Sequence, residues 1–361
     1  MNSKLTKDPK SKESHRPRAV VMLSGGLDST LAAKVLQEQG IEVHGIHFST
    51  GFCIDDHKRA VAPAGEDPKK LRNEALRAGA DLGIPVEMVD ISEEYLDIVY
   101  NPKHGYGAHM NPCIDCRAFM LRKAKEHMAA IGADFIATGE VLGQRPKSQR
   151  RDAMDIVERD SGLKGKLLRP LSAKLMRPTE AEETGLVERE ALLDIKGRGR
   201  RRQMDLIEEK GITDYPSPAG GCCYLTDEVF SRKFRDKMKH KGEQRMDWTD
   251  VALLKVGRHF RIHEGLKLIV GRNERENQFL ERFTAGRVVF EPIDVKGPIA
   301  VSDESLPSAD DENLCAALVA RFSDGKKLPQ VAVAARGGSQ DTRTYNAAPL
   351  WDEDQMERLR I

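Results

Sequence analysis

The stretch Ala19-Val-Val-Met-Leu-Ser-Gly-Gly-Leu-Asp-Ser-Thr-Leu31 decides the fold of the N-terminal part of the chain. An apolar run leads into Ser24, Gly25 and Gly26, and apolar residues at helical spacing follow. This pattern predicts a strand, a glycine turn and a helix. Adjacent glycines let a ligand approach the backbone, and the N-terminus of the helix supplies N–H groups and the positive end of a dipole. The stretch therefore predicts a phosphate-binding turn.

The side chains of this turn favour a pyrophosphate over a single phosphate. Ser24, Ser29 and Thr30 can donate hydroxyl hydrogen bonds, and Asp28 can hold Mg²⁺. The turn is not a Walker A loop, because both the GxxxxGK[ST] spacing and its lysine are missing. An ordinary turn capped by a serine is the alternative.

Residues Ser24-Gly-Gly-Leu-Asp-Ser-Thr30 resemble the SGGxDS[ST] signature of the PP-loop ATP pyrophosphatase families. In those families ATP is cleaved between the α and β phosphates, AMP is placed on a substrate oxygen, and a nucleophile displaces AMP. The resemblance implies ATP and Mg²⁺ as cofactors and a catalytic role for Asp28. It implies that the nucleotide is bound by Ser24, Gly25, Gly26, Asp28, Ser29 and Thr30.

Composition describes a water-soluble globular protein with a charged surface. The chain has 361 residues, of which 39% are hydrophobic and 32% charged. Because 58 basic residues balance 57 acidic ones, total charge gives no argument for nucleic-acid binding. No apolar run approaches the roughly 18 residues of a membrane helix. The N-terminus is polar and lysine-rich, so we expect a disordered tail over 1–17 and a cytoplasmic protein that contacts no membrane.

Strands and helices alternate after the glycine turn. Strands are predicted at 41–48, 86–91 and 134–139, and helices up to Gly40, over 69–82 before Gly83, and over 116–130. This alternation predicts an α/β fold, a doubly wound parallel sheet with helices on both faces. Ligands bind such sheets beyond the carboxyl ends of the strands. Four further candidates for nucleotide binding fall there, although an aromatic residue at a strand end also fits the core: His47, Phe48, Thr138 and Gly139.

Two polar stretches have two interpretations each. Residues 140–149 form either a solvated loop or a loop whose Gln144, Arg145 and Lys147 reach the triphosphate. Residues 167–171 open a region rich in helix formers, and the sheet domain closes near 175. The basic run at 196–202, before a helix over 203–210, is either a solvated surface or a seat for a phosphate backbone.

The remaining third of the chain changes in pattern. The loop at 215–226 presents Cys222 and Cys223, and helical residues follow to Lys241. Residues 251–262 and 266–270 predict a hairpin that begins a smaller C-terminal α+β module. The acidic residues 303–312 predict a mobile insert. Basic residues make the hairpin suitable for RNA, or simply form an exposed strand face: Arg258, His259, Arg261, Lys267 and Arg272.

Cys113 and Cys116 stand in Asn111-Pro-Cys-Ile-Asp-Cys-Arg117, directly before a predicted helix. A helix N-terminus and a neighbouring arginine favour thiolates, and therefore metal binding or nucleophilic attack. The loop lies at the same sheet edge as the glycine turn, so we expect the thiols to face the nucleotide. A structural zinc site with His104 or His109 is the alternative. Cys53 and Cys315 have no partner at a recognisable spacing and are expected to be ordinary residues.

Both cysteine segments, Asn111–Cys116 and Gly221-Cys-Cys-Tyr224, resemble those of tRNA 2-thiouridylases and related tRNA thiouridine synthetases. The 2-thiouridylase pattern has one catalytic cysteine in the first segment, at Cys116, so Cys113 is extra. This departure favours the branch in which three cysteines hold a [4Fe–4S] cluster, with one iron left open for sulfide. On that resemblance Cys113, Cys116 and Cys222 are the metal ligands and catalytic cysteines, with Cys223 as the alternative to Cys222.

A weaker resemblance links the C-terminal module, through 256–261 and 269–272, to a domain of RNA-quality-control proteins. Together these features predict an ATP-dependent tRNA sulfurtransferase with a sulfide or persulfide donor. The predicted domains are 18–175 for ATP, 176–245 for the basic segment and second cysteine loop, and 246–361 for the module. A ligase that makes amides or nitriles around structural zinc, and a non-catalytic RNA-binding protein, remain alternatives. A homodimer is also left open.

Overall fold

The computed structural model describes residues 16–62, 65–216, 223–242, 244–303, 306–337 and 340–361. Within these ranges the chain forms two compact units. Unit 1 comprises residues up to 51, 72–107 and 111–216, and unit 2 comprises 52–71, 108–110 and the residues from 223 onward. The chain therefore contributes two short early segments to a unit built mainly from its C-terminal part.

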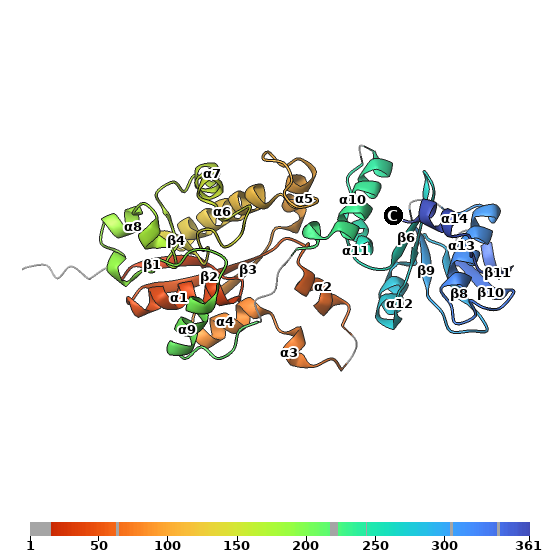
Figure 1. Ribbon diagram of the computed structural model, residues 1–361, viewed down its shortest axis with the longest axis horizontal. Coiled ribbons are helices and arrows are strands. Elements are labelled where there is room, and N and C mark those ends of the chain that lie inside the picture. The colour runs from red at the N-terminus through yellow and green to blue at the C-terminus, as the bar shows by residue number, and fades with distance from the viewer. Residues whose placement is uncertain (1–15, 63–64, 217–222, 243, 304–305, 338–339) are drawn as a thin grey trace, which may run out of the picture. The chain divides into compact units, whose positions relative to one another are not determined.

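Unit 1 is a five-stranded parallel sheet in the order β3-β2-β1-β4-β5. Helices α6 and α7 lie on one side of it, and α1, α4 and α9 lie on the other (Figure 1). The order reverses between β1 and β4, which is where such sheets bind ligands. The predicted doubly wound α/β fold is confirmed.

The elements of unit 1 are β1 (Arg18–Met22), α1 (Leu27–Glu38), β2 (Glu42–Ser49), α4 (Glu74–Leu82), β3 (Val86–Asp90), α5 (Ser92–Tyr100), α6 (Cys113–Ala130), β4 (Phe135–Thr138), α7 (Arg151–Ser161), β5 (Leu167–Leu168), α8 (Glu180–Glu183) and α9 (Arg201–Glu209), with 3₁₀ turns at Ala173–Leu175 and Arg189–Ala191.

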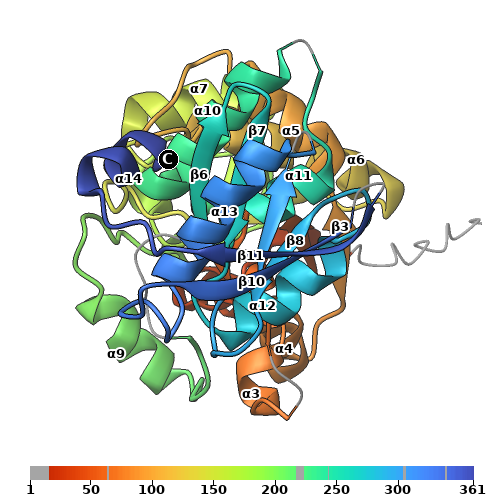
Figure 2. The same cartoon turned by 90° about the vertical axis from the view of Figure 1, so that its right-hand side faces the viewer.

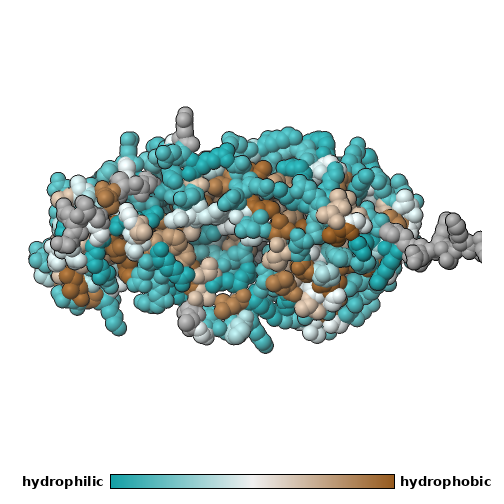
Figure 3. Space-filling view, turned by 180° about the vertical axis from the view of Figure 1, so that it is seen from behind, coloured by the Kyte–Doolittle hydropathy of each residue, from teal (hydrophilic) through white to brown (hydrophobic). Residues whose placement is uncertain are grey.

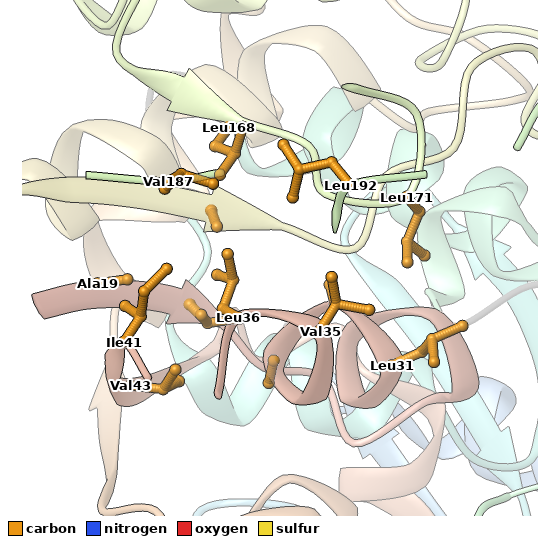
Figure 4. Packing of buried hydrophobic residues seen from close by; sticks show 14 of the residues in the cluster. Ala19, Leu31, Val35, Leu36, Ile41, Val43, Leu168, Leu171, Val187 and Leu192 are labelled. Atoms are coloured by element: carbon orange, nitrogen blue, oxygen red, sulfur yellow. The ribbon is translucent and has the colours of Figure 1, made fainter. Parts of the chain in front are cut away.

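The core of unit 1 lies between β1 and the apolar face of α1. Leu31 and Leu36 of α1 are fully buried and face Leu168 and Leu192 (Figure 4). The region after 167, expected to be helical, instead contains the short strand β5, turns and the single-turn α8. Isolated apolar residues of this region, such as Val187, pack onto this core. Their burial stabilises the region although it forms little regular helix.

Other boundaries in unit 1 differ from the prediction for local reasons. The predicted helix over 69–82 is two helices, α3 (Pro68–Leu71) in unit 2 and α4 in unit 1. The Asn73 side chain accepts hydrogen bonds from the N–H groups of Ala75 and Leu76 and so starts α4. Gly83 ends it in the left-handed region, as predicted. Helix α6 begins at Cys113, three residues earlier than expected.

Unit 2 contains a six-stranded sheet in the order β11-β10-β8-β9-β7-β6, with every strand pair antiparallel. Helix α13 packs against β8, β10 and β11 (Figure 2). This confirms a separate C-terminal α+β module.

The elements of unit 2 are α2 (Ile54–Ala60), α3, the 3₁₀ helix η3 (Tyr224–Thr226), α10 (Glu228–Lys241), α11 (Trp248–Leu254), β6 (Arg258–His263), β7 (Leu266–Val270), α12 (Glu274–Leu280), η4 (Glu281–Phe283), β8 (Val289–Pro292), β9 (Ala300–Asp303), α13 (Ala309–Arg321), β10 (Val331–Gly337), β11 (Gln340–Ala347) and α14 (Glu353–Leu359).

Two predictions about unit 2 are wrong in part. Strands β6 and β7 form the expected hairpin, but residues 251–254 belong to α11, because Asp247 and Asp250 form a reciprocal cap that starts a helix. The acidic residues 303–312 are expected to form a mobile insert, but of those that the structure describes, 303 ends β9 and 309–312 begin α13. Asp303 is buried in β9. Ser308 caps the N-terminus of α13, and the first turn of α13 contains acidic residues. Negative charge is favoured there by the helix dipole.

Lys237 of α10 ties two helices to the sheet of unit 2. Its side chain is 1% exposed, and its Nζ lies 3.0 Å from Asp250 of α11 and 2.7 Å from Asp303 of β9. Burial alone would raise the pKa of Asp303, but Lys267, Lys237 and Arg287 outweigh it and hold that pKa well below its usual range. This contribution to stability is fully present above the ordinary aspartate pKa of about 4 and is lost as pH falls below it.

The described residues contain no helix long and apolar enough to cross a membrane. The face in Figure 3 is mainly hydrophilic, with hydrophobic residues in small scattered groups.

Lys237→Met should lower the free energy of unfolding by about 1–3 kcal/mol, because Asp250 and Asp303 lose the ammonium between them, while Lys241 still pairs with Asp250 and Lys267 with Asp303. Lys239→Met on the exposed face of the same helix should change it by no more than about 0.5 kcal/mol. Urea denaturation of the full chain measures both. Equal effects of the two substitutions would contradict the role assigned to Lys237.

Candidate nucleotide and thiol site

The glycine turn between β1 and α1 is held against the start of α4. Gly25 has φ +75, and a Cβ there would lie 2.1 Å from the carbonyl carbon of Glu74. Arg77 of α4 donates a 2.9 Å hydrogen bond to the Gly25 carbonyl, and its guanidinium is positioned by Glu74 and Asp81. Both the backbone angle and the close approach require glycine at 25.

The three predicted hydroxyl donors differ in availability. Thr30 is fully buried and donates to the Gly26 carbonyl at 3.0 Å. Ser29 is 6% exposed and lies 3.1 Å from both the Ser24 hydroxyl and the Gly26 carbonyl. Ser24 is exposed. The buried hydroxyls therefore shape the turn, and Ser24 is the one that faces solvent.

Two glutamine amides fix the carboxylate of Asp28. Gln144 donates to Oδ2 at 2.7 Å, and Gln203 of α9 donates to Oδ1 at 3.4 Å and to Gln144 Oε1 at 3.1 Å. Both glutamines are buried, whereas Asp28 is half-buried. Each carboxylate oxygen has further acceptor capacity, so the geometry is compatible with a Mg²⁺ ligand. Gln144 thus contacts Asp28, and no sequence signal singled out Gln203.

The end of β4 touches the start of α1. A Cβ on Gly139 would lie 2.5 Å from the backbone nitrogen of Ser29 and 2.6 Å from the carbonyl carbon of Asp28. Gly139 therefore permits this contact. Thr138 is buried and donates to the carboxylate of Glu140 at 3.2 Å.

The two candidates on β2 face different surroundings. The Nδ1 atom of His47 lies 3.0 Å from the Leu23 carbonyl, just before the glycine turn. Phe48 packs against the cluster that contains Val20, Ile46 and Ile136. Phe48 therefore packs as a core residue, as one of its two interpretations allowed, whereas His47 lies beside the glycine turn.

Cys113 and Cys116 both lie in the first turn of α6 and are half-buried thiols. Residues three apart on a helix share a face, so one ligand or metal can reach both sulfurs. Unpaired N–H groups and the dipole at this end of an 18-residue helix favour thiolates. Asp115, also buried, accepts a 2.9 Å hydrogen bond from the His104 backbone and so anchors the preceding loop.

Glu140 joins the ends of the strands to α6, which carries Cys113 and Cys116 and is called the thiol helix below. Its carboxylate lies 2.9 Å from Arg117, the residue after Cys116, and 3.0 Å from the buried Arg169, which also pairs with Glu158. Burial alone would raise the pKa of Glu140, but Arg117 and Arg169 outweigh it, so that pKa is lowered. Sequence reasoning gave Glu140 no role. The sequence shows only an acidic residue directly after a buried strand. The pairing of this residue with Arg117 becomes visible only in the folded chain.

The structure tests the metal prediction only in part. Cys222 lies outside the described residues. Among those described, no three His, Cys, Asp or Glu side chains are grouped so that they could hold a metal ion. Cys113 and Cys116 can supply two ligands. For the zinc alternative, the Nε2 atom of His104 lies 2.7 Å from Asp160, with which it interacts.

The basic run lies along the loop that follows β4. The Gly197 N–H donates to the Leu142 carbonyl at 2.8 Å, and Lys196 and Leu142 form an isolated parallel bridge. Lys196, Arg198, Arg201 and Arg202 are exposed. Arg202 pairs with Asp194 at 2.5 Å. The exposed cations of the basic run therefore adjoin the loop whose Gln144 contacts Asp28.

Comparison with known protein families gives one match in the N-terminal part of the chain and one in the C-terminal part. Residues 17–159 match the family described as the tRNA methyl transferase HUP domain, and residues 257–359 match the NFACT protein RNA binding domain. The chain is thus similar to two RNA-related domains in two separate stretches. This confirms the expected similarity to tRNA-modifying proteins in the N-terminal stretch and to an RNA-binding domain in the C-terminal stretch, whereas residues 221–224 lie outside both matches.

The curated relatives match part of the chain. The chain is 35% identical over 129 residues to the tRNA-specific 2-thiouridylase MnmA of Bacillus thuringiensis (strain Al Hakam), covering 35% of this chain and 33% of that protein. It is 36% identical over 133 residues to tRNA-specific 2-thiouridylase MnmA 2 of Geobacillus kaustophilus (strain HTA426), covering 36% and 34%. The chain therefore matches about a third of the length of these relatives.

Among solved structures, the chain has likeness to a 4-thiouridine synthetase–RNA complex with bound ATP. The identity is 19%, the TM-score is 0.32, and the match covers 55% of this chain and 54% of that one. A TM-score this low supports no inference about this chain.

Gly139→Ala should weaken ATP binding by roughly tenfold or more, because the new Cβ must push β4 away from the start of α1, where the phosphates are expected. Gly199→Ala is the matched control, since no atom lies within 4 Å of its added Cβ. Isothermal titration with ATP and Mg²⁺ measures both variants. Unchanged affinity in Gly139→Ala would contradict the assigned phosphate site.

Proposed function

We propose that this protein uses ATP to adenylate a carbonyl oxygen of a uridine in tRNA and replaces that oxygen with sulfur. The observation that supports this most strongly is an arrangement within unit 1. The glycine turn, Gly139, Glu140 and the thiol helix follow one another in contact at the carboxyl ends of the strands. Partial similarity to tRNA 2-thiouridylases supports the same reaction.

In the first step the turn and the start of α1 bind the phosphates, and Asp28 would hold Mg²⁺, which would neutralise phosphate charge. The uridine oxygen attacks the α-phosphorus, a new P–O bond forms, and the bond to the β-phosphate breaks. Pyrophosphate leaves. Gln144 and Gln203 keep Asp28 in place, and Ser24 donates a hydrogen bond to a phosphate oxygen.

In the second step a sulfur nucleophile attacks the activated carbon. A C–S bond forms, the C–O bond breaks, and AMP leaves with the former uridine oxygen. We assign the sulfur chemistry to Cys113, Cys116 and Cys222, with sulfide supplying the atom. A persulfide donor requires in addition that a second cysteine thiolate breaks the S–S bond, which leaves a cysteine disulfide for an external dithiol to reduce. A [4Fe–4S] cluster held by cysteines would supply an iron site for sulfide, and the thiolates at the start of α6 are suited to such binding.

RNA is positioned mainly through its backbone. The exposed Lys196, Arg198 and Arg201 can contact phosphates next to the proposed active site. Residues 257–359, which match an RNA-binding domain, would bind another part of the same molecule.

The proposal predicts equal amounts of pyrophosphate and thiolated nucleoside when the anaerobically purified chain is incubated with ATP, Mg²⁺, sulfide and bulk tRNA. Asp28→Ala should abolish both products. Cys116→Ala should retain pyrophosphate release and lose the thiolated nucleoside. Phosphate assays and mass spectrometry of digested tRNA measure the two products.

Asp152→Ala, which removes an exposed carboxylate from α7, is the control and should behave as the wild type. Pyrophosphate release that requires ammonia would favour an amide- or nitrile-forming ligase. Binding of tRNA and ATP without pyrophosphate release would favour a non-catalytic RNA-binding protein. Either result would contradict the proposal.

A further inference from the structure

Cys53 and Cys223 lie opposite each other in unit 2. They form an isolated antiparallel bridge, although 53 and 223 are far apart in sequence. The N–H of Tyr224 donates to the Phe52 carbonyl at 2.9 Å, so the hydrogen bond flanks the cysteine pair and does not join the two cysteines themselves. The spacing of the cysteines in the sequence did not reveal that Cys223 is a neighbour of Cys53, and both are free cysteines.

This type of pair has a geometry suited to a disulfide. In a non-hydrogen-bonded antiparallel pair the Cα atoms are about 4.5 Å apart and the side chains leave on the same face. Disulfides span Cα separations of about 4.4–6.8 Å. An antiparallel pair of this type therefore has the backbone separation that a disulfide requires.

Aromatic packing holds both segments in place without help from the thiols. Phe52, directly before Cys53, is fully buried, and its ring centre lies 5.7 Å from that of Trp248 and 6.1 Å from that of Phe230. Tyr224, directly after Cys223, packs 5.2 Å from Phe230. Pre-ordering of this kind raises the effective concentration of one thiol at the other.

The surroundings also allow exchange with small molecules. Both cysteines are only half-buried. Burial lowers the pKa of Lys255, whereas Asp56, Cys53 and Cys223 act in the opposite direction, so this ammonium lies within electrostatic reach of both sulfurs. Its Nζ also lies 5.9 Å from the centre of the Tyr224 ring. Burial raises the pKa of the Cys53 thiol, so exchange at this pair depends on the pairing of the two cysteines and not on a lowered thiol pKa.

We propose that Cys53 and Cys223 are a redox-active pair that closes to a disulfide by exchange with a low-molecular-weight disulfide. One thiolate attacks the small disulfide, forms a mixed disulfide and releases one thiol. The second cysteine attacks the mixed disulfide, forms the Cys53–Cys223 bond and releases the other thiol. The protein pair loses two electrons, which reduce the small disulfide, and a dithiol reverses the reaction.

This pairing distinguishes the adjacent cysteines of the second cysteine loop. Cys223 is assigned to Cys53, which leaves Cys222 for the sulfur chemistry proposed above. The redox pair itself does not depend on adenylation or on RNA. Its test therefore needs neither ATP nor tRNA, and its failure would leave the proposed function intact.

The test equilibrates the reduced, chelator-treated full chain with a series of ratios of reduced to oxidised glutathione. Remaining thiols are then blocked with an alkylating reagent, and the protein is digested with trypsin without reduction. Cys53 falls in peptide 35–58, Cys222 and Cys223 in 211–232, and Cys113 and Cys116 in 104–117. We expect peptide 35–58 to become linked to 211–232 as glutathione is oxidised, and to be released by dithiothreitol.

Three variants assign the bond. Cys222→Ser should keep the link, whereas Cys223→Ser and Cys53→Ser should abolish it. Thermal unfolding shows whether each variant is folded, and Cys315→Ser, at a fully buried thiol in α13, should not alter the link. Alkylation of Cys53 at every glutathione ratio would overturn the proposal. So would a link to Cys222, or protection of both thiols without a link.

Discussion

The buried carboxylate of Glu140, between Arg117 and Arg169, is the interaction on which the arrangement of unit 1 depends. Three elements meet at this group. Arg117 belongs to the first turns of α6, Arg169 follows β5, and Glu140 follows β4. A buried carboxylate is tolerated only when opposite charges and hydrogen bonds compensate for lost water, and here two guanidinium groups and the Thr138 hydroxyl do so.

The consequence is chemical as well as structural. Because Glu140 comes one residue after Gly139, the ion pair fixes the thiol helix relative to the strand that touches Ser29 and Asp28. The turn that is suited to phosphate and the two thiols suited to sulfur or metal chemistry are therefore set on one edge of one sheet. A reaction that activates an oxygen and then replaces it needs both functions close together.

Local sequence predicted the parts of this edge that local chemistry determines. The glycine pair, the strand before it and the helix after it are encoded within thirteen residues, and Gly83 ended α4 as expected.

Contacts between distant segments could not be predicted in this way. Gln203 and Asp28 are 175 residues apart, and no pattern in the sequence indicates their hydrogen bond. The Cys53–Cys223 pair could not be predicted either, because segment 52–71 joins unit 2 through packing of Phe52 and His57. Capping by Asn73 and by Asp247 explains where α4 and α11 begin, which the sequence patterns did not predict.

The most direct test of the account is the ratio of thiolated nucleoside to pyrophosphate in Arg117→Ala, compared with Arg122→Ala on the exposed face of the same helix. If the Arg117–Glu140 pair positions the thiols for the adenylated uridine, Arg117→Ala will still release pyrophosphate in the presence of tRNA. Its ratio will fall by roughly tenfold or more, whereas Arg122→Ala will keep the wild-type ratio. A wild-type ratio in folded Arg117→Ala would contradict the central claim.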